Sequence, residues 1–318
     1  VYYISITQGV RMVNKISIIG AGRVGESTAQ MLAIQKLAQQ IVLIDLDEQY
    51  AKGVALDIQE TSSVYHFDAE LMGASDISNI QDSNIIIITA GMPRKPGMDR
   101  ADVLAINLKI IDEIMDGIIE YAPDAYVIVV SNPVDVLTYY ANQKANWPRN
   151  RIMGQAGILD SMRLSSFIAM ETDYSINDIQ AMVLGGHGDT MVPLPRFTTV
   201  SGISIEHLLD QKTIDRLIQR TRNGGAEILN LKQKSSAYDA PGAAVTIMVE
   251  AIVHNKHRLL PCITMLEGEY GQTDIAIGVP VVLGENGVEK IVELDFTNKE
   301  QQDFNASAQA IKGLIKEI

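Results

Sequence analysis

A glycine-rich segment near the start of the chain constrains the fold most strongly. The run Lys15-Ile16-Ser17-Ile18-Ile19 leads directly into Gly20-Ala21-Gly22-Arg23-Val24-Gly25, and an apolar period from about Val24 to Ala38 predicts a helix. Strand, tight turn and helix in this order are typical of a dinucleotide-binding unit. The first glycine permits the turn, the second lets a pyrophosphate approach the backbone, and the third allows helix and strand to pack closely.

An acidic residue completes this fingerprint. The apolar run Ile41-Val42-Leu43-Ile44 ends in Asp45, twenty residues after Gly25. A carboxylate at this distance accepts hydrogen bonds from the adenosine ribose and repels a 2′-phosphate. The alternative is a glycine-rich turn that merely closes an ordinary βα unit. The combination of strand, glycines, helix and acid predicts NAD, rather than NADP, as the cofactor.

Composition narrows the classes of partner. The chain has 318 residues, enough for two domains of about 150 residues each, and a formal net charge of −13. Nucleic acids and anionic membranes require a basic patch, so we expect neither as a partner. The start of the chain lacks the pattern of a secretion signal, and the expected location is the cytoplasm. The single cysteine, Cys262, permits no intrachain disulfide and is expected to be a small buried side chain.

Strand and helix patterns alternate in the first half of the chain and become mixed in the second half. This succession predicts an α/β fold with an N-terminal Rossmann dinucleotide-binding domain at residues 12–157 and a C-terminal α+β substrate-binding and catalytic domain at 158–318. Residues 1–11 form an extension, although their β-type composition also fits an edge strand or a docking arm. The predicted helices are residues 51–65, 101–121, 214–231, 243–253 and a terminal helix ending at Ile318, and the predicted strands are 69–72, 85–89, 126–130, 179–184, 260–266, 275–282 and 288–294.

Four polar segments fall at predicted strand ends or in loops, where sheets of this kind bind their ligands. They are Arg94–Arg100, Ser131–Asp135, Leu159–Arg163 and Gly185–Thr190. An imidazole suits proton exchange near neutral pH, an aspartate can fix its tautomer, and an arginine fork matches a carboxylate. Together with a nicotinamide, these groups indicate hydride transfer at a carbon that bears a hydroxyl group and adjoins a carboxylate.

These segments and the glycine fingerprint together resemble the lactate/malate dehydrogenase family, specifically its malate dehydrogenases of lactate-dehydrogenase-like type, over roughly residues 12–318. The resemblance implies that His187 is the acid/base, that Asp160 orients it, and that Arg163 clamps the carboxylate shared by the substrates of the family. It also implies a small 2-hydroxy or 2-keto dicarboxylate as substrate and a homo-oligomer, a tetramer for this subgroup, with a dimer as the alternative.

Further roles follow from the same resemblance. Arg100, on a mobile loop, would polarise the substrate carbonyl, and Arg94 would bind the side chain of the substrate and favour malate over lactate. Asn132 would position substrate and cofactor, and Asn107 is also assigned to the cofactor site.

Simpler explanations exist for each residue. His187 could be a loop histidine bound by backbone groups, Asp160 could cap a helix starting near Ser161, and Arg163 could lie on a helix surface. Arg94 and Arg100 could be ordinary exposed loop residues.

His254 and His257 have a spacing that could suit a metal, but exposed histidines near a helix end explain them better. We therefore expect no metal.

At the level of function, the alternatives are a dehydrogenase for lactate or another 2-hydroxy acid, an NAD-using glycosidase on a related fold, and a non-catalytic NAD-binding module. The glycosidase pattern would need a metal held by cysteine and histidine, which the segment around Cys262 does not provide.

Overall fold

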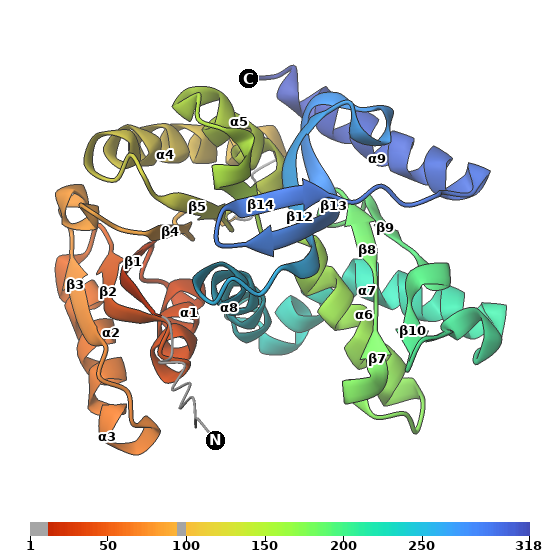
Figure 1. The fold of residues 1–318 in the computed structure, drawn as a ribbon, viewed down its shortest axis with the longest axis horizontal. Helices are drawn as coiled ribbons and strands as arrows, with labels where there is room; N and C mark the ends of the chain where they lie inside the picture. The colour runs from red at the N-terminus through yellow and green to blue at the C-terminus, as the bar shows by residue number, and fades with distance from the viewer. Residues whose placement is uncertain (1–11, 94–99) are drawn as a thin grey trace, which may run out of the picture.

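One large sheet runs through both halves of the chain (Figure 1). The structure is a computed structural model and describes residues 12–93 and 100–318, so the expected extension at residues 1–11 lies outside it. Within the described residues the strands lie in the order β3 (Glu70–Ala74), β2 (Ala38–Ile44), β1 (Val13–Ile19), β4 (Ile85–Ile88), β5 (Tyr126–Val129), β6 (Ile152–Gly154), β12 (Arg258–Glu267), β13 (Thr273–Gly284), β8 (Val183–Gly185) and β9 (Met191–Pro193), and β14 (Gly287–Ile291) pairs with β13.

The strands of the first half, from β3 to β6, are parallel. The chain proceeds from β1 outward to β2 and β3, then returns to the other side of β1 to form β4, β5 and β6. Such a reversal leaves a crevice beyond the carboxyl ends of the central strands, where this type of sheet binds ligands. The α/β fold class predicted from the sequence is therefore confirmed.

Helices cover both faces of this parallel sheet, which explains its uninterrupted apolar runs. All four residues of β4 are buried. Ile85 and Ile87 belong to one core cluster, and Ile86 and Ile88 belong to the other. The helices of this half are α1 (Arg23–Ile34), α2 (Glu48–Glu60), α3 (Ser62–Tyr65), α4 (Arg100–Tyr121) and α5 (Val134–Ala145).

The second half extends the sheet with antiparallel strands. β12 joins the parallel part through the pairing of Ile263 with Gly154 of β6, and β13 carries β8 through the pairing of Gly278 with Gly185. A small separate sheet contains β7 (Ile179–Gln180), β10 (Thr199–Val200) and β11 (Ile203–Ser204), and the helices of this half are α6 (Gly157–Glu171), α7 (Gln211–Lys232), α8 (Asp239–Val253) and α9 (Asn298–Ile315).

Short 3₁₀ helices complete the connections. They are η1 (Ile77–Ile80), η2 (Arg149–Arg151), η3 (Ile176–Asp178), η4 (Pro195–Phe197), η5 (Ile205–His207) and η6 (Glu269–Gly271). Of all the helices in the described ranges, none combines the length and the apolar character that crossing a membrane requires.

Several predicted boundaries were wrong, and three of the differences have clear structural causes. The helix expected to run to Ala38 ends at Ile34, because Lys36 adopts a left-handed conformation (φ 55°) and the chain then enters β2. The helix expected at 51–65 starts earlier, since the Asp47 side chain caps it by accepting from the Tyr50 N–H at 3.1 Å. The strand expected at 179–184 is two strands, β7 and β8, which belong to different sheets.

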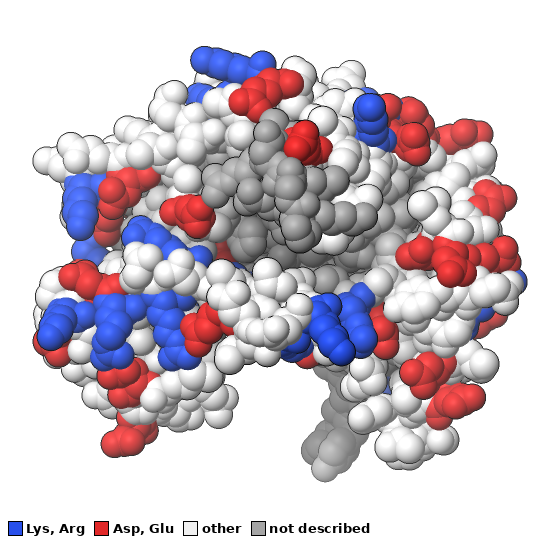
Figure 2. All heavy atoms as spheres, turned by 180° about the vertical axis from the view of Figure 1, so that it is seen from behind, with Lys and Arg blue, Asp and Glu red and all other residues white. Residues whose placement is uncertain are grey.

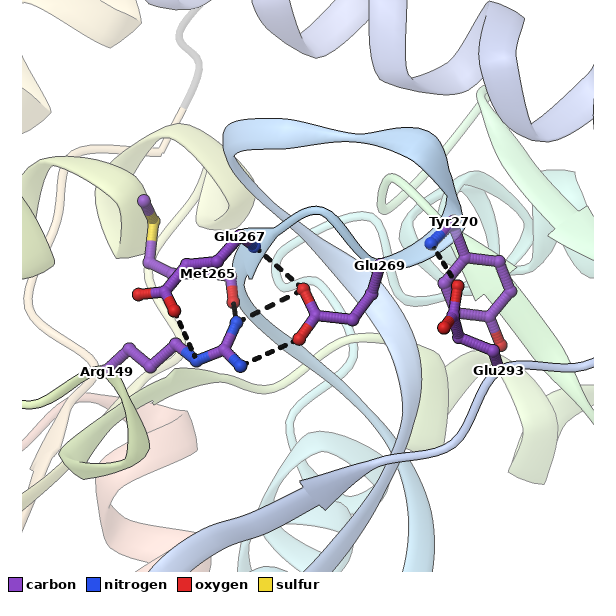
Figure 3. Close-up of polar contacts among 6 residues, drawn as sticks. All are labelled: Arg149, Met265, Glu267, Glu269, Tyr270 and Glu293. Carbon is purple, nitrogen blue, oxygen red and sulfur yellow. Dashed lines mark hydrogen bonds and ion pairs between the residues drawn. The ribbon is translucent and has the colours of Figure 1, made fainter.

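A cluster around Arg149 ties the first half to the β12–β13 hairpin (Figure 3). Its guanidinium donates to both carboxylate oxygens of Glu269, at 3.2 and 2.7 Å, and to the Met265 carbonyl at 3.1 Å. Arg149 lies in η2, directly before β6, and Glu269 lies in η6, directly after β12. The hydrogen bond from Arg149 lowers the pKa of Glu269 to about 2.

Replacing Glu269 with Gln tests this tie. We expect the substitution to lower the free energy of unfolding at pH 7 by about 1–2 kcal/mol, a value reduced for the partial exposure of both side chains. Because the folded-state pKa lies below the usual 4.5, the stabilisation is complete above that pH and disappears as pH falls from 4.5 towards about 2. Urea unfolding at pH 7 and pH 3.5 measures both effects, and an equal wild-type-to-variant difference at the two pH values would contradict this explanation.

Candidate active site

The glycine turn follows β1 directly, at the carboxyl end of this parallel strand. Gly20 has a φ of 107°, and a Cβ added there would lie 2.6 Å from the Ala90 nitrogen. A Cβ added to Gly25 would lie only 1.9 Å from the Gly20 carbonyl oxygen. Gly22, the N-cap of α1, has open space around the same position and no side-chain cap. The turn therefore packs tightly at two glycines and leaves the helix N-terminus open at the third, as an approaching phosphate group requires.

Asp45 follows β2 and reaches this turn. Its carboxylate accepts hydrogen bonds from the Ala21 N–H at 2.9 Å and the Asp47 N–H at 3.2 Å. These bonds fix the carboxylate beside the glycine turn. A carboxylate has about four acceptor positions, so Asp45 retains the capacity to bind ribose hydroxyls.

His187 and Asp160 form a close pair across the second half of the chain. The His187 Nδ1 lies 2.9 Å from one oxygen of the Asp160 carboxylate, and the Arg163 guanidinium lies 3.1 Å from the other. The Asp160 side chain is only 2% exposed. It lies in the first turn of α6, which begins at Gly157, so the alternative that Asp160 is the N-cap was wrong. The predicted acid/base, its orienting partner and the carboxylate clamp are thus brought together.

The protonation of His187 reflects this pairing. Burial alone would lower its pKa, but the charge and hydrogen bond of Asp160, together with the charge of Asp135, outweigh burial and raise the pKa above its usual value. The raised pKa favours the imidazolium form of His187 over the neutral ring. Nδ1 is bound to Asp160, which leaves Nε2 as the nitrogen available to a ligand.

The sequence analysis assigned no role to Asp135, although it ends the Asn132-Pro133-Val134-Asp135 segment. Asp135 lies in the first turn of α5, and its Oδ2 accepts a hydrogen bond from the His187 backbone N–H at 3.1 Å. The side chain is buried, and burial raises its pKa to about 6. The sequence did contain a signal, because Asp135 is a carboxylate in a segment already considered functional. The contact with His187, however, joins residues 52 positions apart, so no local pattern predicts it.

Asn107 and Asn132 hold neighbouring loops together. The buried Asn107 amide on α4 accepts from the Met92 N–H at 2.7 Å and donates to the carbonyls of Met92 at 3.2 Å and Asn132 at 2.7 Å. Asn107 therefore braces the segment after β4 against the segment after β5. The cofactor-binding role expected for it stays a prediction.

A cavity of about 460 Å³ adjoins these groups. Polar side chains of Asn132, Asp135 and His187 meet in it, and α4 and α9 contribute apolar residues such as Leu104 and Ile311. Arg94 lies outside the described residues, as does the side chain of Arg100, the first residue of α4. The described residues therefore include the predicted proton-transfer groups, and the predictions for the two loop arginines stay predictions.

The described ranges contain no group of three or more histidine, cysteine, aspartate or glutamate side chains that could hold a metal ion. His257 contacts Glu289 at 2.8 Å, and His254 is the C-cap of α8. Cys262 is buried in β12, where burial raises its pKa to about 12, and the expectation of a small buried side chain is confirmed.

Charged side chains of both signs share the outer surface. On the face in Figure 2, lysine and arginine side chains lie next to aspartate and glutamate side chains. The chain carries a net charge of −13, so an anionic substrate needs cations of its own at the site. Arg163 is the predicted cation: its side chain is 12% exposed, and its buried Nε has no partner among the described residues.

Comparisons with known proteins agree with this geometry. Two family models match: the NAD binding domain of lactate/malate dehydrogenase over residues 14–154 and the alpha/beta C-terminal domain of the same family over residues 158–318. The malate dehydrogenase of Thioalkalivibrio sulfidiphilus is 54% identical over 304 residues, which cover 96% of this chain and 99% of that protein. The malate dehydrogenase of Nitrosococcus oceani is 55% identical over 300 residues, covering 94% and 96%.

Solved structures show the same similarity. A malate dehydrogenase from Salinibacter ruber superposes with a TM-score of 0.91 at 43% identity, covering 95% of this chain and 97% of that chain. A lactate dehydrogenase from Cryptosporidium parvum, complexed with lactic acid and nicotinamide adenine dinucleotide, has a TM-score of 0.91 at 35% identity, covering 96% and 97%. Backbone similarity is thus equal for enzymes named for malate and for lactate.

Two glycine substitutions separate packing from ligand access at the turn. Gly25→Ala should lower the free energy of unfolding by at least about 2 kcal/mol, because the new Cβ collides with the Gly20 carbonyl. Gly22→Ala has room for its Cβ and should keep wild-type stability, but it should weaken NADH binding by about tenfold or more, since the methyl group occupies the approach of the pyrophosphate. Thermal unfolding and NADH fluorescence titration measure the two effects. Equal stability loss in both variants would refute the distinction.

Proposed function

The chain belongs to the lactate/malate dehydrogenase family, and we propose that it is an NAD-dependent enzyme that interconverts (S)-malate and oxaloacetate. The arrangement that carries this proposal is the buried Asp160 carboxylate shared by His187 and Arg163. It unites a proton donor with a carboxylate-binding cation at one point. NAD, the cofactor of the matching N-terminal domain, fits the crevice made by the glycine turn and Asp45.

The names of the most similar relatives described above, rather than the fold, favour malate over lactate as the substrate. Malate and lactate dehydrogenases superpose equally well on this chain, whereas the two relatives described above, at 54% and 55% identity, are named malate dehydrogenases. In our proposal the choice depends on Arg94, which would pair with the second carboxylate of oxaloacetate. Enclosing that charge without a partner would cost several kcal/mol in a site from which water is excluded.

The described side chains can transfer the proton and bind one carboxylate of the substrate. Bound NADH supplies the hydride. His187, protonated through its pairing with Asp160, donates the Nε2 proton to the oxygen that becomes the malate hydroxyl, and neutral His187 accepts that proton in the reverse reaction. The donors of Arg163 not used by Asp160 bind the carboxylate next to the reacting carbon. Asp160 orients the ring through Nδ1 and stabilises the imidazolium.

Other assignments are part of the same proposal. Arg100 polarises the carbonyl, Asn132 orients substrate and cofactor, and Asp45 binds the ribose. Residues 12–157 serve the cofactor and residues 158–318 the substrate.

We also propose a homotetramer, as the family resemblance implies, and a cytoplasmic location, as expected from the sequence. Sedimentation equilibrium of the purified chain would distinguish the tetramer from a dimer, and fractionation of the source cells would test the location.

The proton-transfer assignment predicts two graded losses. His187→Ala should reduce turnover of oxaloacetate by about 10²- to 10⁴-fold while NADH still binds, because only the proton donor is removed. Asp160→Asn should give a smaller loss of about tenfold to 100-fold, since the imidazole remains but its cation is no longer stabilised. Steady-state kinetics with NADH titrations measure both, and near-normal turnover in His187→Ala would overturn the role.

The substrate assignment predicts a change of specificity. Arg94→Gln should lower kcat/KM for oxaloacetate by at least about 100-fold, or about 2.7 kcal/mol, while kcat/KM for pyruvate rises because an unpaired guanidinium no longer faces its methyl group. NADH oxidation with both keto acids in wild type and variant is the measurement. A wild type that prefers pyruvate would favour lactate dehydrogenase, and one that oxidises NADH with neither would indicate a non-catalytic module.

A further inference from the structure

A second buried carboxylate lies behind the catalytic histidine. Asp135 is 6% exposed, lines the same cavity as His187, and accepts the His187 backbone N–H at 3.1 Å through Oδ2. Its Oδ1 is buried and has no hydrogen-bond partner in the described part of the chain. A buried carboxylate oxygen without a hydrogen bond lowers the stability of the fold. The position of Asp135 beside the titratable His187 therefore requires an explanation.

The charged groups around Asp135 provide this explanation. From the loop between β8 and β9, His187 and Asp189 line the cavity with it, and from α6, Asp160 and Arg163 flank His187. α4 and α9 contribute apolar side chains to this cavity. In the cluster of Asp135, Asp160, Arg163 and His187, two carboxylates and one guanidinium leave one net negative charge beside a neutral imidazole. Protonation of His187 brings that cluster to zero net charge.

We propose that Asp135 is a positioning residue for the reaction: its carboxylate holds the His187 main chain, and its negative charge supports the imidazolium that reduction of oxaloacetate requires. This inference rests on the proposed function, because it assumes that His187 is the proton donor. It assigns the two carboxylates different tasks. Asp160 binds the imidazole ring at Nδ1, whereas Asp135 binds the backbone of the same residue and acts on the ring only through its charge.

Asp135→Asn separates these two contributions, because the amide oxygen can still accept the His187 N–H while the charge is lost. For oxaloacetate reduction at saturating NADH, kcat/KM falls with rising pH as His187 loses its proton. In Asp135→Asn we expect this fall to occur about one pH unit lower, and kcat/KM on the acidic plateau to stay within about threefold of wild type. Asp135→Glu, which keeps the charge, should restore the wild-type pH dependence.

A matched control comes from β13, a strand that contacts the same helix. Asp274 of β13 accepts hydrogen bonds from Tyr139 and Gln143 of α5 at 3.1 and 3.2 Å, and it is not among the residues that line the cavity. Asp274→Asn removes the same amount of charge and should leave the pH dependence unchanged. A profile of Asp135→Asn that superposes on that of wild type, even with reduced activity, would overturn the proposal.

The imidazole can also be observed without activity. NMR titration of His187 in the cofactor-free protein, assigned with His187→Ala, should give a pKa above the usual 6.5 in wild type and a lower value in Asp135→Asn. If Asp135→Asn does not fold, a wild-type His187 pKa at or below 6.5 would still refute the charge role. Failure of the wild type to reduce oxaloacetate would instead refute the proposed function, so the two failures are distinguishable.

Discussion

The placement of the proton-transfer groups depends on the pairing of β12 with β6. This contact joins the parallel sheet to the antiparallel strands, and it requires close approach: a Cβ on Gly154 would lie 2.5 Å from the Thr138 hydroxyl oxygen and 3.0 Å from the Ile263 Cβ. α6, with Asp160 and Arg163, begins three residues after β6. At the far side of the hairpin, a Cβ on Gly278 of β13 would lie 2.5 Å from the Gly185 carbonyl of β8, whose chain continues to His187. Backbone pairing therefore sets the distance between residues that must touch.

This scaffold also explains how an acidic chain can hold an anionic substrate. Net charge acts over long distances and is screened by salt, whereas the groups at the site are buried and act over a few ångströms. Arg163 is attached to Asp160, which limits its motion and fixes its fork, and that same carboxylate favours the charged form of His187. A single buried acid thus holds both the guanidinium and the imidazole to which the proposed function assigns carboxylate binding and proton donation.

Local signals carried most of what could be predicted from the sequence. The glycine turn, Asp45 and the apolar runs of the first half depend on neighbours within one βα unit, and the family resemblance identified the His187–Asp160 pair. Errors arose where tertiary contacts decide: β7 and β8 read as one apolar run, yet they join different sheets. Asp135 was missed for the same reason, because its partner is a backbone N–H that no side-chain pattern reveals.

These constraints explain why proton transfer and substrate discrimination depend on different parts of the chain in the proposed function. His187, Asp160 and Asp135 are held by a strand end, the first turn of α6 and the first turn of α5, all in the packed part of the fold. Proton transfer needs such fixed geometry, because small displacements of reacting groups are costly in rate. Substrate choice has different requirements. A fold common to malate and lactate dehydrogenases cannot itself discriminate between their substrates. The proposed function assigns this discrimination to the side chain of Arg94, which lies in the sequence between β4 and α4 and takes no part in the strand pairings that position the histidine.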